Sequence, residues 1–279
     1  MFSIKKIALA AAVLAACAVP GYAAEMPACA PQTSEQQLAD AETMALLWMR
    51  TAAEYRALCY QGYNAAMAEI DRALADPARS DRPLAIILDC DETVVDNTPA
   101  LGGAAAAGNG RYTSPWWNEW VAQGNSAAMP GAADFLNEVH KKGVAIFYVT
   151  NRLESTGYEA TERNLRALGF PSVDREHLLL AVDKGNKQER FDKVAAKYDV
   201  ILYMGDNAGD LPLDTYGKDR AGRNAVIDAH RKDFGTKYIV FPNPVYGAWV
   251  SALAEGYLSL SPEERDAVDI SLLLTGGGR

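Results

Sequence analysis

Histidine and cysteine are scarce in this sequence, and neither is arranged as a reactive or metal-binding centre. The three histidines lie in separate segments, and no cysteine–histidine cluster has the spacing of a zinc site. None of the four cysteines has an arginine six positions later, so the phosphate-binding loop of cysteine-dependent phosphatases is absent. Zinc-centred and thiol-centred chemistry are therefore not indicated.

Basic residues are also few relative to acidic ones. The chain has 27 Lys and Arg residues against 36 Asp and Glu residues, a formal net charge of −9. An acidic surface argues against binding nucleic acid through a basic face, so we expect no nucleic-acid partner. It does not exclude a small phosphorylated substrate, because a bound metal can supply positive charge locally.

The apolar run at residues 7–19 is too short to span a bilayer stably. It follows two lysines and precedes small residues, which predicts a signal peptide over residues 1–24. Two cleavage patterns are present: a lipobox that ends at Cys17, which would become a lipid anchor to the membrane, and an ordinary site after Ala23. Either pattern predicts export to the bacterial periplasm or attachment to the outer membrane. Export permits disulfides, and Cys29 with Cys59 is one candidate pair, although connectivity cannot be read from sequence.

The length of 279 residues fits one α/β domain with a smaller appended part. We interpret residues 25–33 as a tether, residues 34–270 as the domain, and residues 271–279 as a flexible tail. Apolar residues recur at helical spacing over residues 34–77. Residues 99–114 lack periodicity, and we interpret them as a loop or lid within cap insertions at 99–130.

Strand and helix patterns alternate through residues 84–258, which predicts a central parallel sheet with helices on both faces. The predicted strands cover residues 84–88, 144–150, 177–182, 200–204 and 238–241. The predicted helices between them cover residues 132–142, 155–168 and 187–197. The N-terminal helices and the loop after the first strand are expected to form a small helical cap.

Polar side chains follow four of these apolar strands. Asp89 and Asp91 follow the first, and their i, i+2 spacing places both on one side of the chain. The other three strands are followed by Thr150 and Asn151, by Lys184 and Lys187, and by Asp206 and Asp210. Because ligands bind outside the carboxyl ends of parallel strands, we expect these side chains to meet there.

This set of residue types is typical of phosphoryl transfer through an aspartyl phosphate. A Mg²⁺ ion on Asp89, Asp91 and Asp206 would offset the repulsion between a phosphate dianion and a carboxylate nucleophile. Asp89 would attack phosphorus, while Asp91 would protonate the leaving oxygen and then activate water. Asp91 would reach the metal through its main-chain carbonyl.

The other polar residues have supporting roles in this hypothesis. Thr150 and Lys187 would hold the non-bridging phosphate oxygens, with Lys184 as the alternative to Lys187. Asp210 would contact the metal through a water molecule or would hydrogen-bond the groups that hold the metal. Asn151 would donate to the phosphate or orient Asp89. Glu92 is expected to begin a helix, where the helix dipole favours an acidic side chain.

The motifs resemble those of the haloacid dehalogenase (HAD) superfamily, in its phosphatase branch. The matching motifs are DCDETV at 89–94, TNR at 150–152, Lys187, and GDNAGD at 205–210. Further segments are similar to the bacterial class C non-specific acid phosphatases, which are outer-membrane lipoproteins with 5′-nucleotidase activity. These segments are LWMRTAAEY at 47–55, DNTP at 96–99, WNEW at 117–120 and NPVYGAW at 243–249.

The resemblance covers residues 38 to 258 and implies a Rossmann-like HAD core, Mg²⁺ dependence, secretion and activity at mildly acidic pH. It also implies broad use of phosphomonoesters, often nucleoside monophosphates, and frequent homodimers. The aromatic residues favour nucleotides as well, because Trp117 and Tyr246 on opposite sides of a cleft would sandwich a base for about 1–3 kcal/mol of stacking. Two alternatives stay open: a phosphatase specific for a sugar phosphate or pyridoxal phosphate, and a non-catalytic binding protein on the same fold.

Overall fold

The computed structural model describes residues 35–275 except 79–80, 108–113 and 184. The predicted signal peptide, the lipidation site Cys17, the tether, Cys29 and Lys184 lie outside the described residues. Cys59 is a free and fully buried thiol. Within the part of the chain that is described, no helix combines the length and apolar character needed to cross a membrane.

The centre of the protein is a five-stranded parallel sheet with the strand order β5-β4-β1-β6-β7. These strands are β1 (Leu84–Leu88), β4 (Ala145–Leu153), β5 (Leu178–Ala181), β6 (Asp199–Gly205) and β7 (Tyr238–Val240). From β1 the chain moves outward through β4 and β5, then returns to build β6 and β7 on the other side. The carboxyl end of β1 therefore faces the crevice where the strand order reverses, the usual ligand site of such sheets.

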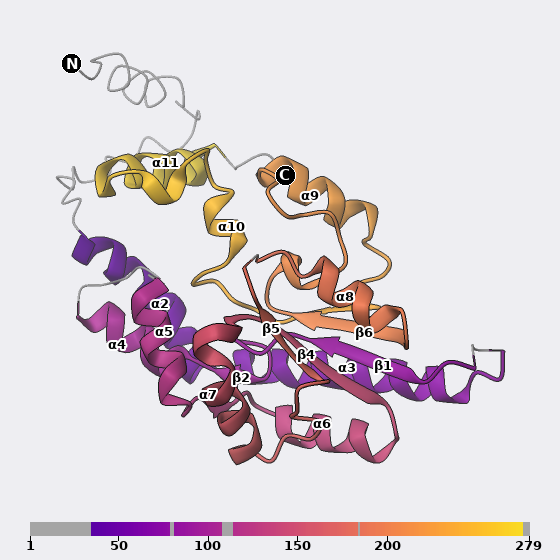
Figure 1. Ribbon diagram of the computed structural model, residues 1–279. Coiled ribbons are helices and arrows are strands. Elements are labelled where there is room, and N and C mark those ends of the chain that lie inside the picture. The colour runs from indigo at the N-terminus through magenta and orange to yellow at the C-terminus, as the bar shows by residue number, and fades with distance from the viewer. Residues whose placement is uncertain (1–34, 79–80, 108–113, 184, 276–279) are drawn as a thin grey trace.

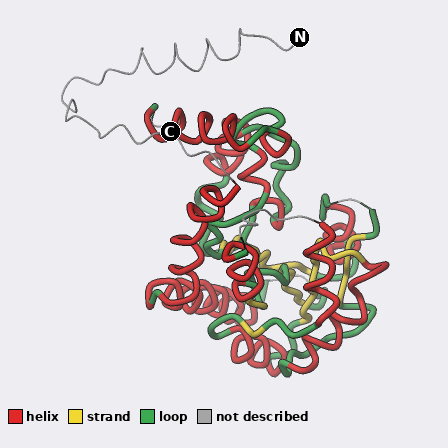
Figure 2. The backbone as a smooth tube through the Cα atoms, turned by 90° about the vertical axis from the view of Figure 1, so that its left-hand side faces the viewer, coloured by secondary structure: helices red, strands yellow, loops and turns green. Residues whose placement is uncertain are grey.

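Helices cover both faces of this sheet, as Figures 1 and 2 show. One face packs against α3 (Ala53–Ala75), α6 (Ala132–Lys141) and α7 (Glu154–Ala167), and the other against α8 (Gln188–Ala195) and α9 (Arg220–Ala229). Within β1, Ile86 and Leu88 enter the first core while Ala85 and Ile87 enter the second, as strand alternation requires. The predicted α/β fold with a covered parallel sheet is confirmed, although helix α9 was not predicted.

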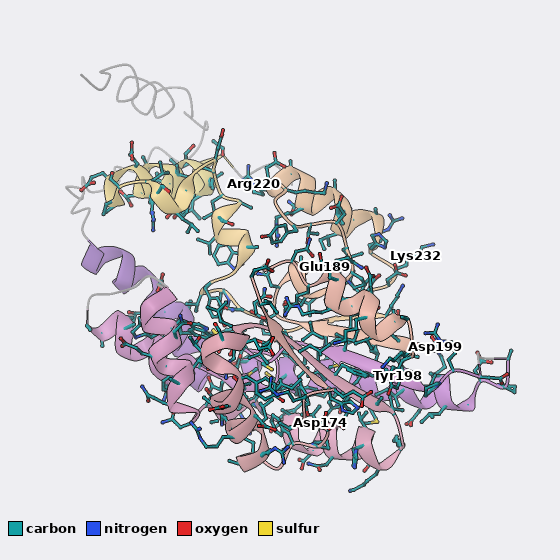
Figure 3. The ribbon with its side chains drawn as sticks, viewed as in Figure 1. Asp174, Glu189, Tyr198, Asp199, Arg220 and Lys232 are labelled. Atoms are coloured by element: carbon teal, nitrogen blue, oxygen red, sulfur yellow. The ribbon has the colours of Figure 1, made fainter. Side chains whose placement is uncertain are left out.

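Figure 3 draws the side chains that fill both of these cores. Asp199, labelled there, begins β6 at the edge of the sheet opposite to the functional residues, and its N–H donates to the Pro83 carbonyl at 2.9 Å. The candidate residues for phosphoryl transfer lie at the other end of the sheet, where the parallel strands have their carboxyl ends.

The helical cap differs from the sequence prediction in one segment. Residues 99–114 were interpreted as a loop, but α4 (Thr98–Ala106) runs through most of their first half. Alanine has the highest helix propensity, and Pro99 in the first turn suits a helix start, so Gly102 and Gly103 do not prevent the helix. The cap further contains α2 (Glu35–Thr51), α5 (Ser114–Gln123) and a two-stranded antiparallel sheet of β2 (Val95–Asp96) with β3 (Ala127–Ala128).

The prediction of a flexible tail at residues 271–279 is wrong for its first four residues. After α10 (Ala248–Ser251), helix α11 (Pro262–Leu274) continues to Leu274. Ser261 and Glu264 form a capping box at its start, and the Tyr257 hydroxyl donates to Asp269 at 2.9 Å. These local bonds hold the helix in a segment whose sequence has little apolar periodicity.

The apolar core predicts a measurable cost for truncating Leu136, a fully buried residue of α6. Leu136→Ala should lower the free energy of unfolding by about 2–5 kcal/mol, because it removes buried methyl groups and leaves a cavity. Leu273→Ala is the matched control, since Leu273 is 82% exposed and should change stability by about 0.5 kcal/mol or less. Chemical denaturation of both variants measures the difference, and equal losses would contradict the described packing.

Candidate active site

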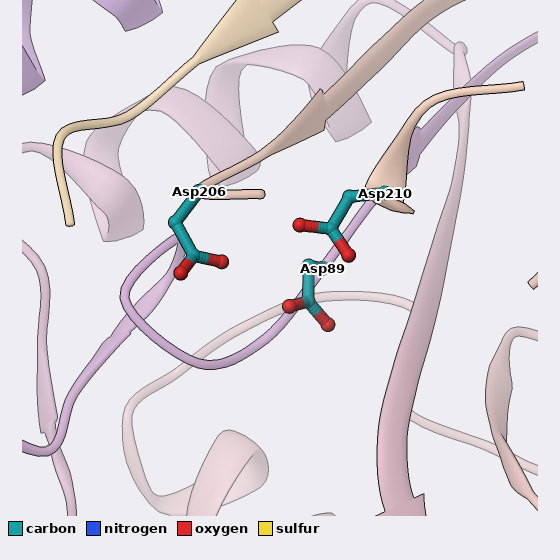
Figure 4. A group of neighbouring side chains, drawn as sticks. All are labelled: Asp89, Asp206 and Asp210. Atoms are coloured by element: carbon teal, nitrogen blue, oxygen red, sulfur yellow. The ribbon is translucent and has the colours of Figure 1, made fainter. Parts of the chain in front are cut away.

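Three carboxylates converge at the carboxyl edge of the sheet (Figure 4). Asp89 follows β1, Asp206 follows β6, and Asp210 ends the short 3-10 helix η1 (Ala208–Asp210). One oxygen from each lies within 4.8 Å of the others. The N–H of Asp89 donates to the Met204 carbonyl at 2.9 Å, which extends the β1–β6 ladder and fixes the Asp89 backbone.

Lys187 neutralises part of this negative charge. Its ammonium lies 2.7 Å from Asp89 Oδ1 and 2.8 Å from Asp210 Oδ1, and its side chain is 1% exposed. Burial alone would lower the pKa of Lys187, but the carboxylates of Asp210 and Asp89 raise that pKa above its ordinary value. Lys187 therefore stays charged and bridges the first and last motifs.

One lysine does not balance three carboxylates. Burial raises the pKa of Asp89 from 3.8 to about 7, against the opposing effect of Lys187 and with the help of Asp210. Burial, followed by the charges of Asp210 and Asp89, likewise raises the pKa of Asp206 well above its ordinary value. Closely spaced hard oxygen donors with unmet negative charge fit a divalent cation, so Asp89, Asp206 and Asp210 can hold a metal.

The turn after β6 brings Asp210 to this cluster. A Cβ on Gly205 would lie 2.2 Å from the Cβ of Asp210, so only glycine permits this close approach. The Asn207 side chain accepts from the Gly209 N–H at 3.2 Å, and Asp210 Oδ2 accepts from the Asn207 N–H at 2.8 Å. The segment at 205–210 thus folds back on itself and leaves Asp210 Oδ1 for Lys187.

The carboxylate of Asp91 lies apart from this group and binds an arginine. Oδ1 of Asp91 accepts from Arg152 Nη2 at 2.7 Å and from Asn97 Nδ2 at 2.8 Å. The side chains that could hold a metal are those of Asp89, Asp206 and Asp210, so Asp210 joins the two expected carboxylates, and the main-chain carbonyl of Asp91 stays a predicted ligand. Arg152 was not predicted to contact Asp91, although the TNR motif contained it.

Thr150 and Asn151 lie within the last four residues of β4, and their side chains have different surroundings. Thr150 is fully buried, and its Oγ1 accepts from the Arg152 N–H at 3.2 Å, so its own O–H can donate to a ligand. Asn151 is exposed and bonds the Gly185 carbonyl at 2.8 Å and Arg190 Nη2 at 2.7 Å. The Asn151 amide therefore bonds Gly185 and Arg190 and not Asp89, and its donation to a phosphate stays a prediction.

Arg190 is a further cation that the sequence reasoning missed. It lies one helical turn beyond Lys187 on α8, and its guanidinium also donates to the Thr150 carbonyl. The i, i+3 spacing from Lys187 was the available signal.

Glu92 does not begin a helix, contrary to expectation. It occupies a left-handed turn with φ of 50°, because the chain reverses toward β2 after the first motif. Its buried carboxylate accepts from the Asn97 N–H at 2.8 Å and from the Tyr246 hydroxyl. Burial, then the neighbouring charge of Asp91, raises the pKa of Glu92 well above its ordinary value.

Trp117 and Tyr246 meet, but not as the two walls of a base sandwich. Their ring centroids are 6.0 Å apart with 55° between the planes, and Trp117 is 6% exposed. A base cannot enter between rings that contact each other at this angle. The predicted sandwich is therefore corrected to one aromatic wall, in which half-buried Tyr246 is the more accessible ring.

Comparison with known proteins places this geometry in context. A family model described as HAD superfamily, subfamily IIIB (Acid phosphatase) matches residues 5–249. The class C acid phosphatase from Bacillus anthracis is 37% identical with a TM-score of 0.78, over 84% of this chain and 97% of that chain. The crystal structure of the Bacillus anthracis class C acid phosphatase with tungstate bound is 35% identical with a TM-score of 0.77, over 85% and 97% of the two chains.

The raised pKa values of Asp89 and Asp206 predict a pH dependence of stability in the metal-free protein. Between pH 3.8 and about 7 the folded state keeps protons that the unfolded chain releases, so the free energy of unfolding should fall as pH rises. Thermal unfolding in EDTA across this range measures the slope. Asp206→Asn should reduce the slope, because the amide does not titrate.

A divalent cation should reverse this loss. Mg²⁺ should raise the melting temperature more at about pH 7 than at about pH 5, because the ligand carboxylates must be ionised to bind it. Equal stabilisation by Mg²⁺ at both pH values would contradict an excess of negative charge among the three carboxylates. An unchanged pH dependence of stability in Asp206→Asn would contradict it as well.

Proposed function

Since the chain belongs to subfamily IIIB of the HAD superfamily, the acid phosphatases, we propose that it hydrolyses nucleoside 5′-monophosphates through an aspartyl phosphate on Asp89. The family itself establishes a phosphoric monoester hydrolase. The observation that carries the proposed route is the placement of Asp89, bridged by Lys187 to Asp210, in the crevice beside β1. Tungstate bound to a related phosphatase supports recognition of a tetrahedral oxyanion at such a site.

The proposed reaction uses side chains positioned by three strands, β1, β4 and β5. A carboxylate oxygen of Asp89 forms a bond to phosphorus as the bond from phosphorus to the leaving oxygen breaks, and Asp91 gives that oxygen a proton. Lys187 and the hydroxyl of Thr150 hold the non-bridging oxygens. Asp91 then takes a proton from water, which attacks phosphorus and releases inorganic phosphate and free Asp89.

The carboxylates of Asp89 and Asp206, with Asp210 behind them, are proposed to hold Mg²⁺. When bound, the ion supplies positive charge that offsets repulsion between the phosphate dianion and Asp89. Lys187 retains its two carboxylate partners and orients the nucleophile.

The aromatic wall supports a nucleotide as substrate. The Tyr246 ring lies beside the first motif, because its hydroxyl donates to Glu92. A base that stacks on one aromatic face gains about 1–3 kcal/mol. A sugar phosphate or pyridoxal phosphate remains the alternative substrate class, and a binding protein without turnover is the less favoured alternative.

We also propose export of the chain, on the basis of the leader pattern at residues 1–24. Mass spectrometry of the mature protein distinguishes a lipid-modified Cys17 from cleavage after Ala23. We further propose that the chain forms a homodimer, because the family resemblance implies one. Light scattering would measure the oligomeric state.

The first experiment measures phosphate release from a nucleoside 5′-monophosphate and from an aryl phosphate at mildly acidic pH. Mg²⁺ should support release, EDTA should stop it, and Asp89→Asn should abolish it without loss of the fold, because an amide is nearly isosteric but is not a nucleophile. Retained turnover in Asp89→Asn would refute the covalent route. Release from neither substrate would favour the narrow-substrate or binding alternatives.

The stacking role of Tyr246 has a separate test. Tyr246→Ala should raise KM for the nucleoside monophosphate by about 10-fold and raise KM for a small aryl phosphate much less. Tyr246→Phe keeps the ring and should keep that preference while losing the bond to Glu92. Equal changes for both substrates in Tyr246→Ala would show that the ring does not read the base.

A further inference from the structure

Asn97 is a fully buried amide whose hydrogen-bonding capacity is completely used. Its Oδ1 accepts from the indole N–H of Trp120 and from the hydroxyl of Ser126, each at 2.8 Å. Its Nδ2 donates to Asp91 Oδ1 at 2.8 Å and to Glu92 Oε2 at 3.3 Å. Two donors and two acceptors are the full inventory of an asparagine side chain.

Trp120 fixes the direction of this amide. An indole N–H can only donate, so the Asn97 atom that faces it must be the carbonyl oxygen. A reversed amide would set N–H against N–H at Trp120 and carbonyl oxygen against the carboxylate of Asp91. The orientation that is ambiguous for many asparagines is therefore determined here, and Asn97 must donate to Asp91.

The groups that fix Asn97 belong to the cap. Trp120 lies on α5, and Ser126 immediately precedes β3. Ser126 is itself held by the Asn164 side chain of α7, which accepts from its N–H at 3.1 Å and donates to its carbonyl at 2.9 Å. A continuous set of hydrogen bonds thus runs from the cap and α7 to the second aspartate of the first motif.

The two oxygens of Asp91 are consequently unequal. Oδ1 accepts from Asn97, from Arg152 Nη2 and, at 3.1 Å, from Arg152 Nε. The one bond to Oδ2 among the described residues comes from the same Nε at 3.2 Å. Oδ2 is therefore the oxygen of Asp91 that the surrounding side chains bond less.

We propose that Asn97, oriented by Trp120 and Ser126, is a positioning residue that presents Oδ2 of Asp91 for general-acid catalysis. The inference rests on the proposed function, in which Asp91 protonates the leaving oxygen. During that step the proton on Oδ2 moves to the leaving oxygen while its bond to phosphorus breaks and the bond from Asp89 to phosphorus forms. Asn97 contacts no reacting atom and acts through Asp91.

The dependence of rate on the leaving group distinguishes positioning from a structural role. Phenyl phosphate and 4-nitrophenyl phosphate have nearly the same size, but phenolate needs a proton on departure far more than nitrophenolate does. The ratio of their kcat/KM values, which report the step that forms the aspartyl phosphate, measures the contribution of the acid. General-acid catalysis typically contributes about 10²- to 10⁴-fold.

Two variants and a control make the test. Asn97→Asp keeps the acceptors for Trp120 and Ser126 and, as a carboxylate, has no hydrogen to donate to Asp91. It should lower kcat/KM for phenyl phosphate about 10-fold more than for 4-nitrophenyl phosphate. Trp120→Phe keeps an aromatic ring but loses the indole N–H, so it should shift the ratio in the same direction by less. Trp48→Phe, on α2 and packed edge-on against Tyr55, should leave the ratio unchanged.

The outcomes separate this inference from the proposed function. Equal losses for both substrates in Asn97→Asp and Trp120→Phe would overturn the positioning role while leaving the phosphatase intact. If Asn97→Asp does not fold, as circular dichroism would report, the ratio in Trp120→Phe decides alone, and an unshifted ratio overturns the role. Failure of the wild-type protein to hydrolyse either ester would instead refute the proposed function.

Discussion

The structure is organised around an excess of buried carboxylate over buried cation at one edge of a parallel sheet. Asp89, Asp206 and Asp210 share a space in which one oxygen of each lies within 4.8 Å of the others, and Lys187 is the cation that contacts two of them. Isolated ions are costly to bury, so such a cluster persists only with compensating charge. The imbalance is the physical reason that the site fits a divalent metal and an acid phosphatase.

Asp91 and Glu92 show a second way to accommodate neighbouring acids. Asp91 receives a guanidinium and an amide, whereas burial raises the pKa of Glu92 and favours its neutral form. The two adjacent carboxyl groups share Asn97 as a hydrogen-bond donor and differ in their other partners. Arg152 contacts Asp91, whereas the Tyr246 hydroxyl contacts Glu92.

Local sequence rules predicted the strands and the convergence of Asp89, Asp206 and Lys187, because alternation and parallel connection determine where strand ends meet. The same rules did not reveal the direction of side chains that bond across the fold. Asn97 meets Trp120 and Ser126 only after α4 and α5 have packed, and Asn151 turns to Arg190 only when α8 is in place. The tilt between Trp117 and Tyr246 likewise depends on tertiary packing, which periodicity does not encode.

The central position of β1 also constrains how the chain reaches this state. β1 pairs with β4 and with β6, so Leu88 lies opposite Tyr148 on one side and Met204 on the other. During synthesis the first motif emerges long before either neighbour, and its strand has two unpaired edges until most of the chain is available. Pairings between distant segments form slowly and expose strand edges to aggregation. Asp89, the proposed nucleophile, is thus made well before the strands that complete its surroundings, so a chain truncated before β6 would lack the described site.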